Sequence, residues 1–94
     1  MKIISADDVD AALDFPALTD TLADAFRGGV HAPPRHHHTI ANADSADQTL
    51  LLMPAWTDFR NAGTADGGFI GVKIVTVSPD NNKRSKPAVM GLYL

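Results

Sequence analysis

The sequence contains no cysteine, which excludes disulfide bonds, zinc–thiolate sites and a catalytic thiol. It has no apolar run of the roughly 20 residues that a membrane-spanning helix requires. Positive charge is not in excess either, because eight Lys and Arg stand against eleven acidic residues, giving a net charge of −3. We therefore expect neither a nucleic-acid interface nor a membrane segment. The opening MKIISADDVD has no apolar core of a signal peptide, so a cytoplasmic protein is expected.

The 94 residues suit one domain near the lower end of the usual size range. Apolar residues make up 45% and charged residues 20%, as in ordinary globular proteins. A chain of this length buries only about 60–70% of the surface that its unfolded form exposes. Its core is expected to be thin, and a partner chain could supplement it.

The first third of the sequence has the pattern of two short helices. Ser5 followed by Asp8 is a capping-box pattern and predicts a helix near residues 6–13. Asp14 suits the N-cap of a second helix, since a proline two residues later fits the first turn. The glycine pair at 28–29 is expected to end this helix. Apolar residues recur there at steps of three and four, as a stripe that must pack on another surface: Phe15, Leu18, Leu22 and Phe26.

The rest of the sequence reads as strands separated by polar turns. A proline closes the third predicted strand, and the fourth, FIGVKIVTV, is rich in β-branched residues. The expected strands cover residues 2–4, 35–40, 49–53, 69–77 and 88–94, with polar loops at 57–68 and 79–87. Two N-terminal helices packed on a mixed, mostly antiparallel sheet make an α+β fold. The sequence stops at apolar Leu94 within a predicted strand, which suggests a truncated product, a cloning boundary or a part that awaits another chain.

Lys73 is the most unusual residue, because it lies in the middle of an apolar strand. Val75 and Val77 share its face, so its ammonium is desolvated unless an anion meets it. It could contact a substrate carboxylate or act as a perturbed amine, or it could extend to water from the strand. Arg35 suits bidentate binding of a carboxylate, although most arginines are simply solvated.

The four histidines suggest a metal site that the sequence does not complete. His36 and His38 would share one face of a strand and His37 the other, with His31 nearby. The segment has no acid or cysteine to complete a ligand set, so ordinary polar strand residues are the preferred interpretation and no metal site is predicted. The Gly67–Gly71 segment is not a dinucleotide fingerprint, because its spacing is wrong and a strand follows it. The basic residues at 83–86 are interpreted as a solvated turn, with contact to a cofactor phosphate as the alternative.

Four ordered motifs resemble the amino-terminal part of the ornithine cyclodeaminase/mu-crystallin family: PPRHHHTI, LLLMPAW, GVKIVTVSPDN and KPAVMGLYL. The opening IISADDVDAALDFPALTDTLADAF is similar to the first strand and two helices of that family. The resemblance covers nearly the whole chain. It implies that residues 1–94 form one partial domain for substrate binding and homodimerisation. A separate Rossmann domain would bind NAD or NADP.

The resemblance also implies roles for three residues. Arg35 and Lys73 would hold the carboxylate of a small amino, imino or keto acid, Lys73 would also take part in catalysis, and Met53 would border the pocket. Two cations on one carboxylate would fix the α-carbon for hydride transfer. No GxGxxG is present, so the chain is expected to bind no cofactor and to be inactive alone. A non-enzymatic dimerisation or small-carboxylate-binding module is the alternative.

One position departs from the family pattern. Members that handle a diamine are similar in placing an acid near the position of Leu51, just before LMP. An apolar residue there argues against ornithine as the substrate and favours a smaller or apolar acid.

Overall fold

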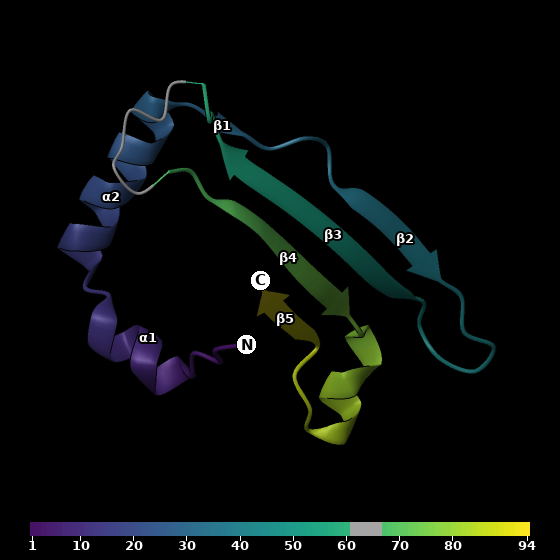
Figure 1. The fold of residues 1–94 in the computed structure, drawn as a ribbon. Helices are drawn as coiled ribbons and strands as arrows, with labels where there is room; N and C mark the ends of the chain where they lie inside the picture. Colours follow the sequence, from purple (N-terminus) through teal and green to yellow (C-terminus); the bar gives the residue numbers. More distant parts are fainter. Residues whose placement is uncertain (61–66) are drawn as a thin grey trace.

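The computed structural model describes residues 1–60 and 67–94, which form two α-helices, one five-stranded sheet and a 3₁₀ helix (Figure 1). The elements follow in the order α1 (Ala6–Ala12), α2 (Phe15–Gly28), β1 (Val30–His31), β2 (His36–Ile40), β3 (Gln48–Thr57), β4 (Ile70–Val77), η1 (Pro79–Arg84) and β5 (Val89–Tyr93). The predicted α+β class with a mostly antiparallel sheet is confirmed. The described residues contain no Rossmann arrangement, since every pairing between their strands is antiparallel.

Both helices begin at the caps that the sequence predicts. The Asp8 carboxylate accepts a hydrogen bond from the Ser5 amide at 2.9 Å, and the Ser5 hydroxyl accepts one from the Asp8 amide at 3.2 Å. The Ser5 amide, followed by the Ser5 hydroxyl, lowers the pKa of the Asp8 carboxyl. Asp14 caps α2 by accepting from the Ala17 amide at 2.8 Å. The helix stops at Gly29, whose φ of 90° suits glycine.

The strand expected at residues 2–4 is wrong. These residues lie outside regular structure, and none of the five described strands pairs with them. Ile3 and Ile4 can supply apolar side chains to a strand but not its hydrogen bonds, which a neighbouring strand must provide.

The sheet is built around the long strand β3, which pairs with β4 along one edge and with both β1 and β2 along the other (Figure 1). β1 pairs with the last residues of β3, and β2 pairs with the first five. β5 continues the sheet beyond β4.

Pro54 lies inside β3, although the sequence suggests that it ends the strand. The Thr57 amide donates to the Phe69 carbonyl on the β4 side at 3.0 Å. Hydrogen bonding alternates along an antiparallel strand, so even-numbered Pro54 turns its nitrogen toward the other edge. There the connection through Pro33 and Pro34 separates β1 from β2, so the missing donor of Pro54 interrupts no pairing.

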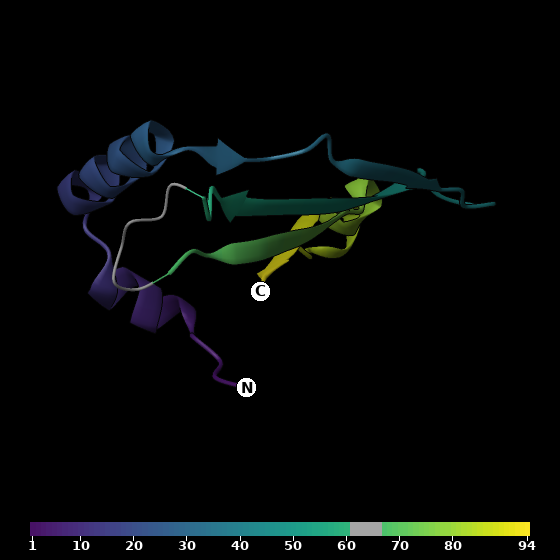
Figure 2. The ribbon, with the colours of Figure 1, turned by 45° about the horizontal axis from the view of Figure 1, so that its top comes forward.

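The chain forms little core by itself. Val75, at 6% exposure, is the one buried apolar residue within residues 1–60 and 67–94. The helices lie beyond one end of the sheet and leave most of its faces uncovered (Figures 1 and 2). The predicted apolar stripe of α2 remains largely in solvent, with Phe15 84% and Phe26 75% exposed. The radius of gyration is 16.9 Å, against about 12 Å for a compact chain of this length.

The loops differ from expectation in one place. The segment after β4, expected to be a polar loop, begins with the 3₁₀ helix η1. Of the loop expected at 57–68, residues 61–66 lie outside the described part. In the described ranges, no helix has the length and hydrophobicity needed to cross a bilayer.

Candidate functional site

The strand register places three residues side by side on one face of the sheet. Met53 of β3 is paired with Lys73 of β4, and Lys73 is paired with Tyr93 of β5. Paired residues on neighbouring strands point to the same face. The cationic side chain of Lys73 is therefore flanked by a thioether on one side and a phenol on the other.

Arg35 lies beside the same line of residues. β2 begins one residue later, where His36 is paired with Leu52. The same antiparallel register, continued by one residue, sets Arg35 next to Met53 on the edge opposite Lys73. Arg35 itself is exposed and lies just outside β2. We refer to Arg35, Met53, Lys73 and Tyr93 as the Lys73 row.

Continued by one residue, the strand register sets Arg35 and Lys73 two strands apart, on either side of Met53. Two interstrand spacings separate the backbones at Arg35 and Lys73, roughly 10 Å. Within the described ranges, no carboxylate lies at ion-pairing distance from either one. The row thus presents two positive charges that this part of the chain does not neutralise.

Lys73 is half-buried, and its ammonium group lies over the aromatic ring of Tyr93. Its Nζ lies 5.6 Å from the ring centroid of Tyr93, within the range of a cation–π interaction. The valine next along the strand face, Val75, is the buried residue of the sheet. The predicted apolar surroundings of Lys73 are therefore present on this face.

Small and apolar side chains flank the row along the strands. On one side Leu51 is paired with Val75, and on the other Ala55 is paired with Gly71. On this face of the sheet, the surface beside the row therefore carries small side chains at Ala55 and Gly71 and larger apolar ones at Leu51 and Val75.

The four histidines lie on β1 and β2. The ring centroids of His36 and His38 lie 6.1 Å apart on one face of β2, while His31 stacks on Trp56 at 5.9 Å. In the described part of the chain, no group of three or more His, Cys, Asp or Glu residues could hold a metal ion.

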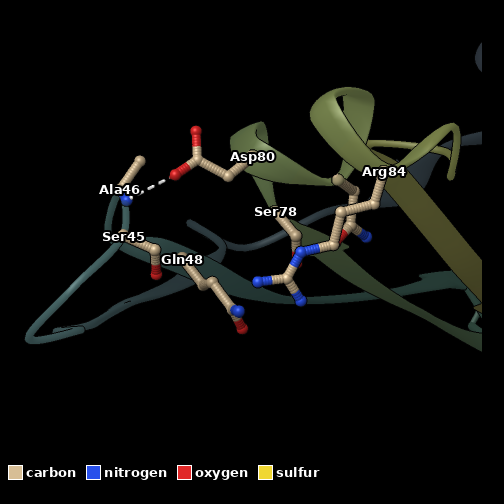
Figure 3. A pocket seen from close by; sticks show the side chains of 7 residues that line it. Ser45, Ala46, Gln48, Ser78, Asp80 and Arg84 are labelled. Atoms are coloured by element: carbon tan, nitrogen blue, oxygen red, sulfur yellow. Dashed lines mark hydrogen bonds between the residues drawn. The ribbon is translucent and has the colours of Figure 1, made fainter.

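A small polar pocket lies at the far end of the sheet, where the β2–β3 turn meets η1 (Figure 3). Asp80 accepts from the Ala46 amide at 2.9 Å and pairs with Lys83 Nζ at 2.8 Å. The Lys83 hydrogen bond, followed by the Ala46 amide, lowers the pKa of the Asp80 carboxyl. The residues that line the pocket are Ser45, Ala46, Gln48, Ser78, Asp80, Asn81 and Arg84.

The basic residues at 83–86 are all exposed, which agrees with their interpretation as part of a solvated segment. Lys83 already has a carboxylate partner in Asp80. A cofactor phosphate would therefore have to compete with Asp80 for Lys83.

Tyr93 is the member of the row that sequence reasoning missed. Its place opposite Lys73 depends on the register between β4 and β5, which η1 and the segment after it set. The available signal was alternation: in KPAVMGLYL, Tyr93 stands on the same strand face as Val89 and Gly91. That pattern identifies the face but not the partner.

Comparison with curated proteins finds similarity to three longer proteins. The chain is 30% identical over 96 residues to an uncharacterized protein of Schizosaccharomyces pombe, covering 99% of this chain and 27% of that one. It is 31% identical over 90 residues to Protein SAR DEFICIENT 4 of Arabidopsis thaliana, covering 87% and 25%. It is 32% identical over 85 residues to a Delta(1)-pyrroline-2-carboxylate reductase of Colwellia psychrerythraea, covering 89% and 24%.

The chain thus spans about a quarter of the length of the curated relatives it matches. No protein-family profile matches it, and no solved structure matches it significantly. The similarity to a reductase is a partial one that fits a portion of an oxidoreductase.

Proposed function

We propose that this chain is the carboxylate-binding portion of an NAD(P)-dependent oxidoreductase of the ornithine cyclodeaminase/mu-crystallin type. Its substrate would be a small cyclic imino acid or the corresponding amino acid. The observation that carries the proposal is the Lys73 row, in which two cations without a carboxylate partner among the described residues flank Met53.

The chemistry of the row suits a carboxylate. A guanidinium and an ammonium on either side of one anion form charge-assisted hydrogen bonds, which are stronger than neutral ones. Gripping the carboxylate from two sides restricts rotation of the substrate and fixes its α-carbon. In this role Arg35 binds and orients, while Lys73 binds and can also hold or move a proton next to an imine nitrogen.

The partial relative named Delta(1)-pyrroline-2-carboxylate reductase supports the substrate class. The substrate in that name is a small ring that carries a carboxylate and no second amine. Leu51 is in keeping with such a substrate, because it sets an apolar side chain beside the row. The shallow Ala55–Gly71 side leaves space for a compact ring.

The described residues offer no fit for a nicotinamide dinucleotide. Such cofactors bind at a parallel β-α-β unit with a glycine-rich turn before the helix, whereas both α-helices here precede every strand of an antiparallel sheet. The cofactor, when bound, supplies the hydride chemistry. We assign its binding to a separate domain, in keeping with relatives about four times as long.

Homodimerisation is the second part of the proposal. The large apolar side chains left in solvent lie on both helices and on the sheet, including Phe26, Trp56, Ile70 and Leu92. Exposed apolar surface on this scale is typical of protein interfaces. A second copy would supply the core that one chain lacks.

The test is a titration of the chain with pyrrole-2-carboxylate, a stable planar ring carboxylate, followed by NMR. We expect binding, and about 10- to 100-fold weaker binding for Arg35→Gln or Lys73→Gln, because each change removes one charge-assisted contact. Lys86→Gln is the matched control, an exposed lysine outside the row, and pyrrole-2-carboxamide is the uncharged control ligand. Equal affinity for acid and amide, or an unaffected Lys73→Gln variant, contradicts the proposal.

A further inference from the structure

We infer that Tyr93 is a positioning residue for Lys73, holding the ammonium beside Met53 and ready for an anion. The inference rests on the proposed carboxylate site and adds to it a residue from β5. Its starting point is the direct antiparallel pairing of Lys73 with Tyr93. Nζ lies 5.6 Å from the centre of the Tyr93 ring.

The ring acts on a side chain that has few other constraints. Lys73 has a flexible four-carbon stem, and ordering such a side chain on ligand binding costs conformational entropy. Its other cross-strand neighbour, Met53, offers no charge to hold an ammonium. In residues 1–60 and 67–94, the polar end of the Lys73 side chain interacts with the Tyr93 ring and with no carboxylate. The ring therefore limits the positions of Nζ before any ligand arrives.

An aromatic ring orients a cation without cancelling its charge. A carboxylate in the same place would pair with Lys73 and compete with the substrate, as Asp80 pairs with Lys83 at the far end of the sheet. The ring face attracts through its quadrupole and leaves the ammonium hydrogens free to bond an anion. Holding the side chain ready in this way reduces the ordering that binding would otherwise require.

Lys73 contacts the face of the Tyr93 ring and not its hydroxyl, so two substitutions can separate the contribution of the ring from that of the hydroxyl. Tyr93→Phe keeps the ring and Tyr93→Leu removes it. Leu92→Ala is the matched control on the same strand, because Leu92 is paired with Ile74 and points to the opposite face. Tyr93 is 74% and Leu92 55% exposed, so neither change removes a buried side chain.

The first measurement is the NMR chemical shift of the Lys73 ε-CH₂ protons, which lie near the ring face. We expect these protons to be shifted upfield by the ring current in the wild-type chain and in Tyr93→Phe and Leu92→Ala. In Tyr93→Leu they should return to the position of a solvated lysine. An unshifted resonance in the wild-type chain overturns the inference directly.

The second measurement is the affinity for pyrrole-2-carboxylate. Tyr93→Leu should bind about two- to five-fold more weakly, as loss of an exposed cation–π contact predicts, while Tyr93→Phe should restore wild-type affinity. If Lys73→Gln weakens binding and Tyr93→Leu does not, the positioning role fails and the carboxylate site stands. If Lys73→Gln leaves binding unchanged, the proposed function fails instead.

Discussion

Two lysines, Lys73 in the middle of β4 and Lys83 in η1 beyond the end of that strand, are in opposite electrostatic situations. Near the turn, Lys83 is paired with Asp80 at 2.8 Å, and Asp80 also accepts from the Ala46 amide. In the middle of the sheet, Lys73 meets an aromatic ring, and no carboxylate of the described chain neutralises it. The positive charge of Lys83 therefore has a carboxylate partner within the fold, whereas that of Lys73 has none among the described residues.

The difference cannot be explained by exposure alone. Lys83 is exposed, so its pairing with Asp80 is expected to contribute little to stability. Lys73 is half-buried among apolar neighbours, where a charge without an anion is more costly. Among the described residues, the lysine with the more costly charge is the one without a carboxylate partner, which is consistent with a binding role for it.

The largest expected effect comes from giving Lys73 the kind of partner that Lys83 already has. Met53→Glu puts a carboxylate directly opposite Lys73 and beside Arg35. We expect about 10- to 100-fold weaker binding of pyrrole-2-carboxylate, because the internal anion occupies both cations. The measurement is the NMR titration described above.

The control for that change is Met90→Glu. Met90 is paired with Thr76 and faces the opposite side of the sheet from Lys73. Met90→Glu adds the same charge but cannot reach the row. The affinity of this variant for pyrrole-2-carboxylate should stay within about two-fold of the wild-type value at 0.15 M salt, because exposed charges more than roughly 8 Å apart are then largely screened. Equal losses in the two variants would show that net charge governs binding and would remove the distinction between the row and the rest of the surface.

The second prediction concerns the apolar support beneath the row. Val75→Ala removes two methyl groups from the one buried side chain of the described residues and should lower the free energy of unfolding by about 1–2 kcal/mol. Val89→Ala is the matched control, because Val89 shares that sheet face and is 61% exposed. Its effect should stay within about 0.5 kcal/mol. Urea unfolding monitored by circular dichroism measures both, and equal effects would mean that Val75 is not buried in solution.

The sequence predicts local features of this fold better than it predicts relations between strands. Ser5, Asp8 and Asp14 act within three residues of themselves, and each cap forms as expected. Pro54 misleads because its tolerance depends on a gap between β1 and β2, which no local pattern reveals.

The candidate site shows the same limit. Lys73 is conspicuous because a charge interrupts an apolar strand, and Arg35 and Met53 were assigned through resemblance. Their place in one row, and the addition of Tyr93, follow from two strand registers. A register depends on which residues pair across loops, so the sequence of one strand cannot specify it.

The smallest expected effect is a pH dependence confined to the turn. The Lys83 hydrogen bond lowers the pKa of Asp80 below its ordinary value of about 3.9. A carboxyl with a lowered folded-state pKa contributes stability that is complete above the unfolded pKa and is lost as pH falls through the folded one. Hydrogen exchange of the Ala46 amide should therefore accelerate, relative to its intrinsic rate, below about pH 4 and stay protected above it.

Asp80→Asn separates this effect from general acid unfolding. The amide keeps an oxygen that can accept from Ala46 but loses the charge that holds Lys83, so the pH step at Ala46 should disappear while moderate protection remains. The Lys73 row has no carboxylate of the described chain to protonate, so the amides of β3 and β4 around Met53 and Lys73 should show no matching step. If the amides of the row accelerated their exchange below about pH 4 as much as the Ala46 amide does, acid would be loosening the whole sheet. The pH dependence at Ala46 could then not be attributed to the Asp80–Lys83 pair.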